Sequence, residues 1–439
     1  MSAKQDRSTR YLPVRPNLDQ LKHQAKDLLR AIRRGDPAAV EELKKYHPTG
    51  EVLIEAAEEI KLADAQLALA RSYQVPSWQR LVQACKLIDA IWRDDVEAVR
   101  KLILKYPHLL HENAGIRNSN WGPPLTYAAN LGRDEIIKML NELGATDLET
   151  AIERAVLQSK IGTARMLCEM GALAKFGGQP PDDALEGPAY TLSASGTALI
   201  FELGGKAVDA RGNTLAPVHV VLESDSRKPT DKHEILEMYV RHGLELPDTP
   251  TMALHRGRID LLEEHLRRDP GLLHRTFSHE EIFPPELGCH DEVLATQGTP
   301  LTGTTLLHMC VDYDELEIAH WLLARGTDPN AKAAIDKDGF GGHTALFATV
   351  VSQPNYWMNR QNRPQAAPFT QLLLDHGADP NVRASLSKQL HPGYAPRYDV
   401  ETRFEYRNVT PLGWGKQFHA KVFVSEPAMR LIEAAGGHE

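Results

Sequence analysis

Apolar residues recur at helical spacing through most of the chain, in short runs separated by turns that contain glycine or proline. The stretch GTTLLHMCVDYDELEIAHWLLARGTDPN, at residues 303–330, is the clearest example. It predicts a first short helix around residues 306–310, a polar break at residues 312–314, and a second helix that Gly326 ends. One helix pair of this length cannot bury its apolar face alone, so the pattern predicts neighbouring pairs.

Such neighbours can be traced on both sides of this stretch. A Pro-x-Leu-Leu-His ending occurs at residues 107–111 and again at 270–274, after similar helical runs. Self-similarity on this scale is typical of stacked helical hairpins. Further helix pairs are predicted at residues 123–145, 148–172, 209–243, 251–274, 342–381 and 409–436.

The pattern G-x-T-x-L-H…E-I-A-x-x-L-L-x-x-G-x-D-x-N at residues 303–330 resembles the ankyrin repeat, with Leu306 where that repeat usually has proline. The resemblance extends over most of residues 89–437. It implies an all-α, mainly helical repeat solenoid, an ankyrin-like helix-turn-helix stack with short hairpin loops. It also implies that His219 and His308 make hydrogen bonds that fix a turn and a helix start. The function implied is protein–protein recognition on the concave face and the hairpin tips.

The chain is predicted to have three parts. Residues 1–17 are expected to form a flexible lead, residues 18–88 a helical cap module, and residues 89–439 the repeat array. Asn17 and the Asp36-Pro37 pair are predicted to start the first two helices. The first 85 residues or so resemble a helical leader seen ahead of ankyrin arrays in bacterial proteins. The array is predicted to carry insertions at residues 175–208, 275–302, 353–368 and 382–408, the last of them a Tyr- and Arg-rich loop.

Composition limits the classes of function. The chain has 439 residues, ordinary apolar (42%) and charged (25%) fractions, and a net charge of −9. This charge argues against non-specific nucleic-acid binding, which needs a cationic surface. Only four cysteines are present, none in a Cys-x-x-Cys pair, which favours a reducing compartment. We find no secretory signal and no apolar run of about 20 residues. These features predict a cytoplasmic protein that does not bind a membrane, and we expect a monomer that requires no cofactor.

Candidate partner-binding residues lie in the predicted turns and insertions, where exposed aromatic side chains are typical interface anchors. The alternative for each aromatic residue is that it covers a neighbouring repeat. The glycine-rich stretch 336–343 is interpreted as a hairpin tip and not as a phosphate-binding loop, because no Lys-Ser/Thr follows it. The candidates are Trp121, Asp338, Phe340, His343, Tyr356 and Trp357.

The main alternative is an enzyme or metal protein built around the 275–302 insertion, with His308 or His343 nearby. Imidazole, thiol and carboxyl groups are concentrated there, and zinc prefers such ligands. The ligands would be His279, Glu280, Cys289 and His290. Their spacing matches no established metal motif, and Pro284-Pro285 interrupts any helix between them. No catalytic motif is present either, so we favour a binding module and assign no catalytic residue.

Overall fold

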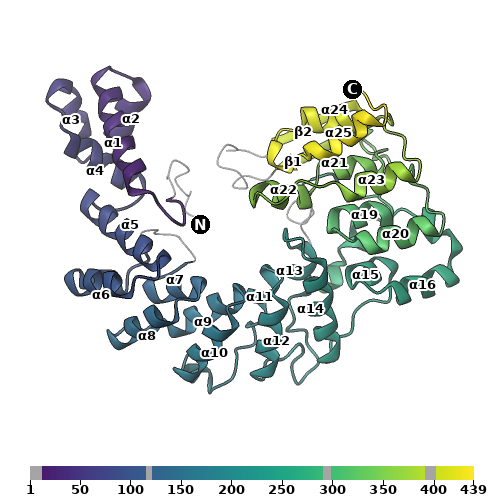
Figure 1. Cartoon of the computed structure of the whole chain (residues 1–439), viewed down its shortest axis with the longest axis horizontal. Coiled ribbons are helices and arrows are strands. Elements are labelled where there is room, and N and C mark those ends of the chain that lie inside the picture. Colours follow the sequence, from purple (N-terminus) through teal and green to yellow (C-terminus); the bar gives the residue numbers. More distant parts are fainter. Residues whose placement is uncertain (1–11, 115–120, 290–297, 391–401) are drawn as a thin grey trace. The chain divides into compact units, whose positions relative to one another are not determined.

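The computed structural model describes residues 12–114, 121–289, 298–390 and 402–439, which form mostly short helices (Figure 1). The chain divides into two compact units, residues 1–179 and 180–439. The predicted borders at residues 17 and 88, between the lead, the cap module and the repeat array, stay a prediction. In the described residues, no helix is both long and apolar enough to cross a membrane.

The first unit begins with two helices that start where the sequence predicts. The Asn17 side chain accepts hydrogen bonds from the N–H groups of Asp19 and Gln20, and Asp36 caps the second helix ahead of Pro37. Both predicted caps are confirmed. The helices of this unit are α1 (Leu18–Arg33), α2 (Pro37–Tyr46), α3 (Gly50–Ile54), α4 (Leu62–Ser72), α5 (Trp78–Trp92), α6 (Val96–Lys105), α7 (Pro124–Leu131), α8 (Asp134–Glu142), α9 (Leu148–Leu157) and α10 (Ile161–Glu169).

Residues 12–17, the described part of the predicted lead, pack against α5 and α7. The Leu12 side chain is buried. The Tyr127 hydroxyl on α7 donates a hydrogen bond to the Val14 carbonyl and accepts one from Trp92 Nε1 at 2.8 Å. Arg15 forms an ion pair of 2.9 Å with Asp89 on α5. These contacts hold the chain before α1 against the first repeats.

The second unit also consists of helix pairs that follow one another in sequence order. Figure 1 shows α19, α21 and α24 following one another through the stack, and each contacts the next. The helices are α11 (Glu186–Tyr190), α12 (Ala194–Glu202), α13 (Val218–Glu223), α14 (Pro229–Arg241), α15 (Pro250–His255), α16 (Ile259–Arg268), α17 (His279–Ile282), α19 (Leu306–Tyr313), α20 (Leu316–Ala324), α21 (Ala345–Val350), α22 (Gln353–Arg360), α23 (Pro368–Asp375), α24 (Pro411–Gln417) and α25 (Glu426–Ala434). Three predicted insertions therefore contain helices of their own, namely α11 and α12, α17, and α22.

Within the stretch 382–408, which is predicted as a loop, the described residues form two paired strands, which we call the β-hairpin. Strands β1 (Ala384–Leu390) and β2 (Thr402–Val409) pair antiparallel, with Leu386 opposite Tyr406 and a register shift between Ala384 and Leu386. Tyr406 is buried and packs edge-on against Trp414 of α24 at 4.8 Å between ring centroids. The hairpin is thus attached to the helical stack through its apolar face.

Two buried ion pairs join the α14 region to the α19–α20 helix pair. Arg227, just before α14, donates to Asp312 of α19 at 2.7 Å, and their side chains are 2% and 1% exposed. Lys232 of α14 lies 3.0 Å from the Glu315 carboxylate, with side chains 3% and 4% exposed. His233 reaches the same carboxylate at 2.8 Å. Asp312 therefore belongs to the core, whereas the sequence pattern places it in a polar break.

Candidate functional site

The α19–α20 pair begins with a capping arrangement between Thr305 and His308. His308 Nδ1 lies 2.9 Å from the Thr305 hydroxyl, and its Nε2 donates to the His343 carbonyl at 3.1 Å. Burial lowers the pKa of His308 to about 3, so this imidazole is neutral. The structural role expected for His308 is confirmed, because both ring nitrogens are used to fix the helix start and the next repeat.

The glycine-rich stretch before α21 is a tight turn that is hydrogen-bonded to strand β1. Asp336 Oδ1 accepts hydrogen bonds from the N–H groups of Asp338 and Phe340, each at 2.9 Å. Gly341 has φ +125°, and a side chain there would collide with the Ala334 carbonyl. Its N–H donates to the Ser385 carbonyl at 2.6 Å. The interpretation as a hairpin tip is confirmed, since glycine alone fits this close approach.

Two pockets adjoin along this side of the second unit, and we call them together the hairpin groove. The larger, of about 700 Å³, lies between residues 276–281, the tip 334–343 and the β-hairpin. The smaller, of about 430 Å³, lies between the start of α15, the end of α16 and residues 275–286. Phe277 and Glu281 line both pockets. The two pockets therefore share a wall that belongs to the predicted 275–302 insertion.

Three of the predicted partner-binding residues line the larger pocket: Asp338, Phe340 and His343. Phe340 is only 5% exposed, because the guanidinium groups of Arg403 and Arg407 lie 4.9 and 4.3 Å from its ring centroid. Arg403 also lies 4.0 Å from Asp338. Phe340 thus packs against two arginines, of which Arg403 lines the larger pocket, and does not itself present an exposed ring.

His343 is buried in the wall of the larger pocket. Its Nε2 donates to the Pro300 carbonyl at 3.0 Å, and its Nδ1 has no hydrogen-bond partner among the described residues. Burial lowers its pKa to about 4, which keeps the imidazole neutral near pH 7. The Pro300 bond fixes the proton on Nε2 and leaves Nδ1 as an acceptor.

Ile335 is the residue of this groove that sequence reasoning missed. It lines the larger pocket, and it is 68% exposed, although it is a large aliphatic residue. A single isoleucine inside a polar, glycine-rich tip was the available signal. An exposed aliphatic side chain at the edge of a pocket is a natural contact for an apolar group of a ligand.

The other three candidates lie outside the hairpin groove. Trp121 belongs to the first unit, where its ring lies 4.9 Å from that of Tyr127. On α22, Tyr356 stacks on Phe423 at 4.8 Å, and Trp357 Nε1 donates to the Asp225 carbonyl at 2.7 Å. Both α22 aromatic residues therefore have packing roles within the second unit. Their role in partner binding stays a prediction.

The residues predicted as alternative metal ligands differ in their burial and contacts. His279 packs against Phe283 at 5.2 Å, and Glu280 is exposed at the smaller pocket. Cys289 is buried, which raises the pKa of its thiol to about 12. His290 lies outside the described residues. Within the described ranges, no group of three or more His, Cys, Asp or Glu residues could hold a metal ion.

We expect Trp357→Phe to lower the free energy of unfolding by about 1 kcal/mol, because the Asp225 carbonyl loses its donor while most ring packing is kept. Urea denaturation of the two proteins measures the difference. Tyr356→Phe is the matched control, since it leaves the ring in its stack on Phe423. Equal stability of the two variants would show that the indole hydrogen bond contributes nothing.

Comparison with known proteins finds a family model that matches the clearest helix pair. The family model described as the ankyrin repeat matches residues 302–334, which contain α19, α20 and the following turn. These residues are similar to an ankyrin repeat. The prediction of an all-α fold of stacked, ankyrin-like helix pairs is confirmed by this match together with the helix pairs of the structure.

Solved ankyrin structures are also similar to the chain, with low sequence identity and low TM-scores. The human ASB11 ankyrin repeat domain is 16% identical with a TM-score of 0.26, over 72% of this chain and 99% of that domain. The ankyrin repeat domain of Bcl-3, a member of the IkappaB protein family, is 16% identical with a TM-score of 0.21, over 66% and 99%. No curated protein matches the sequence.

Proposed function

We propose that the second unit binds an extended segment of a partner protein in the hairpin groove. The observation that carries the proposal is the pair of adjoining pockets beside the ankyrin repeat, which share Phe277 and Glu281 as a common wall. Stacked repeats use surfaces of this kind for recognition, because successive repeats supply successive contact points. A segment crossing both pockets can place one side chain in each.

The contacts offered to such a segment are mixed. Ile335 supplies exposed aliphatic area at the larger pocket, and Arg403 and Asp338 supply charge beside it. At the smaller pocket, Glu280 and Glu286 are exposed acidic side chains. Apolar contact favours affinity, and charged groups at the rim favour specificity. The proposal places binding in the cytoplasm, which is supported by four cysteines that are all unpaired.

Selection of peptides on the full chain tests this proposal. A displayed library of random segments of about 16 residues, long enough to cross both pockets, is selected on the wild-type protein. Peptides that bind in the groove should bind Ile335→Asp at least roughly tenfold more weakly, because a carboxylate replaces an apolar contact. Circular dichroism should be unchanged, since Ile335 is exposed.

Val52→Asp is the matched control, because Val52 is 67% exposed but belongs to the first unit. It should retain every peptide selected on the wild-type protein. If no selected peptide distinguishes Ile335→Asp from Val52→Asp, the hairpin groove is not the binding surface.

A further inference from the structure

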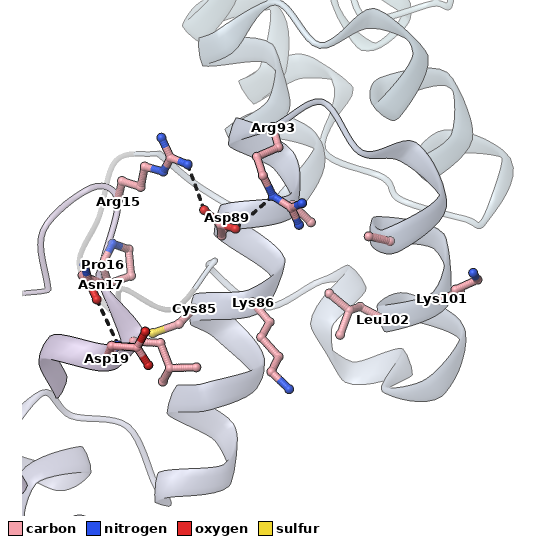
Figure 2. A pocket seen from close by; sticks show the side chains of 13 residues that line it. Arg15, Pro16, Asn17, Asp19, Cys85, Lys86, Asp89, Arg93, Lys101 and Leu102 are labelled. Carbon is pink, nitrogen blue, oxygen red and sulfur yellow. Dashed lines mark hydrogen bonds and ion pairs between the residues drawn. The ribbon is translucent and has the colours of Figure 1, made fainter. Parts of the chain in front are cut away.

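The first unit contains its own pocket, of about 710 Å³, between the residues that precede and begin α1 and the facing sides of α5 and α6 (Figure 2). Part of its wall is apolar. Leu18, Ala98 and Leu102 line it and are only half-buried, and Ala90 forms a buried part of the wall. Aliphatic groups of a ligand can therefore be covered there.

The acidic groups of this pocket are already paired. Asp89 forms ion pairs with Arg15 at 2.9 Å and Arg93 at 3.0 Å, and Figure 2 shows both guanidinium groups directed at it. The pKa of Asp89 is lowered, chiefly by its hydrogen bond from Arg15. Asp19 is paired with Lys22 at 2.8 Å. Neither carboxylate is left to attract a cationic ligand.

Two lysines of the pocket give it a surplus of positive charge. Lys86 and Lys101 both line it and are exposed. Figure 2 shows Lys86 extending from α5. Among the described residues, neither lysine has an ion pair with an acidic side chain. This local surplus occurs in a chain whose net charge is −9, so it does not follow from the overall composition.

We propose that this pocket binds an acidic, amphipathic segment of a partner protein. Aliphatic side chains of the segment contact Leu18 and Leu102, and its carboxylates pair with Lys86 and Lys101. Among the described residues that line the pocket, none is an aromatic residue on which bases could stack, and the chain is acidic, so a protein segment fits better than a nucleic acid. This surface is separate from the hairpin groove and does not depend on its function.

The double variant Lys86→Glu/Lys101→Glu tests the proposal in the same peptide selection on the full chain. Peptides rich in Asp and Glu should bind this variant at least roughly tenfold more weakly than the wild-type protein, because two attractive contacts become repulsive. Lys26→Glu/Lys206→Glu is the matched control for the change in net charge. Both of its lysines are exposed and lie outside the pocket. The wild-type protein, the two double variants and Ile335→Asp should all have the same circular dichroism spectrum.

The most enriched acidic peptide is then synthesised, and its affinity should fall as salt is raised, because exposed charge pairs are screened. A copy with its Glu residues changed to Lys should bind the double variant more tightly than the wild-type protein. The proposal is overturned if no peptides are lost on the double variant, or if the lost peptides are not acidic. Tighter binding of a polyuridine oligonucleotide than of any selected peptide, abolished by the same variant, would also overturn it. A failure here leaves the Ile335→Asp comparison intact.

Discussion

Glu315→Leu should lower the free energy of unfolding of the second unit by about 3–5 kcal/mol, the usual cost of breaking a buried ion pair. The Glu315 side chain is 4% exposed; its carboxylate forms an ion pair with Lys232 at 3.0 Å and a hydrogen bond with His233 Nε2 at 2.8 Å. Burial opposes its ionisation, but Lys232 and His233 outweigh burial and hold the pKa of Glu315 below its usual value. Without the carboxylate, Lys232 is left as a buried cation over the Tyr313 ring.

The double variant Lys232→Met/Glu315→Leu should recover most of that loss, because no unpaired charge then remains in the core. Urea denaturation of the wild-type protein and the variants measures both values. Glu264→Leu is the matched control. Its ion pair with Arg268 lies on the surface of the same unit, with side chains about half exposed, so its loss should cost less than about 1 kcal/mol. Equal effects of Glu315→Leu and Glu264→Leu would contradict the buried-pair interpretation.

For the α19–α20 helix pair, the sequence predicts the local features but not the contacts with residues far away in the chain. The helix pair, its end at Gly326 and the role of His308 follow from periodicity and capping, which involve residues a few positions apart. Asp312 is different. It lies in a polar stretch of the sequence, yet it is 1% exposed, because Arg227, 85 residues earlier, neutralises it. No local pattern identifies a partner at that separation.

The hairpin of residues 384–409 was missed for a related reason. Phe404 and Tyr406 alternate with charged residues along β2, which is a strand pattern, but the stretch is short and charged. Its arginines cover Phe340, so a residue expected to be an exposed anchor is 5% exposed. Prediction of the hairpin groove from the sequence is limited in the same way. The sequence located the insertion and the tip that line it, whereas the exposure of Ile335 and the shared wall at Phe277 depend on tertiary packing.

Acid should destabilise the second unit at pH values above those at which carboxylates of ordinary pKa titrate. Burial lowers the pKa of His308 to about 3 and that of His343 to about 4, whereas the ordinary value in an unfolded chain is 6.5. The unfolded state therefore binds more protons below pH 6.5. The stability that these neutral imidazoles contribute is fully present above that pH and is lost as the pH falls toward 4. Each should cost about 2 kcal/mol by about pH 5.

The contribution of one imidazole can be isolated with His308→Gln. Glutamine keeps a donor and an acceptor but cannot titrate, so this variant should be less stable near pH 7.5 and yet lose about 2 kcal/mol less on going to about pH 5. Partial burial and the nearby Glu315 carboxylate raise the pKa of the neighbouring Asp314 to about 6. The effect of Asp314 on the pH dependence of stability therefore has the opposite sign. Asp314 is common to all the proteins compared, so its effect cancels. His320→Gln is the control, because His320 is exposed. Urea denaturation at the two pH values gives both slopes. If His308→Gln and His320→Gln depend on pH to the same extent, the buried His308 imidazole does not contribute to the acid sensitivity.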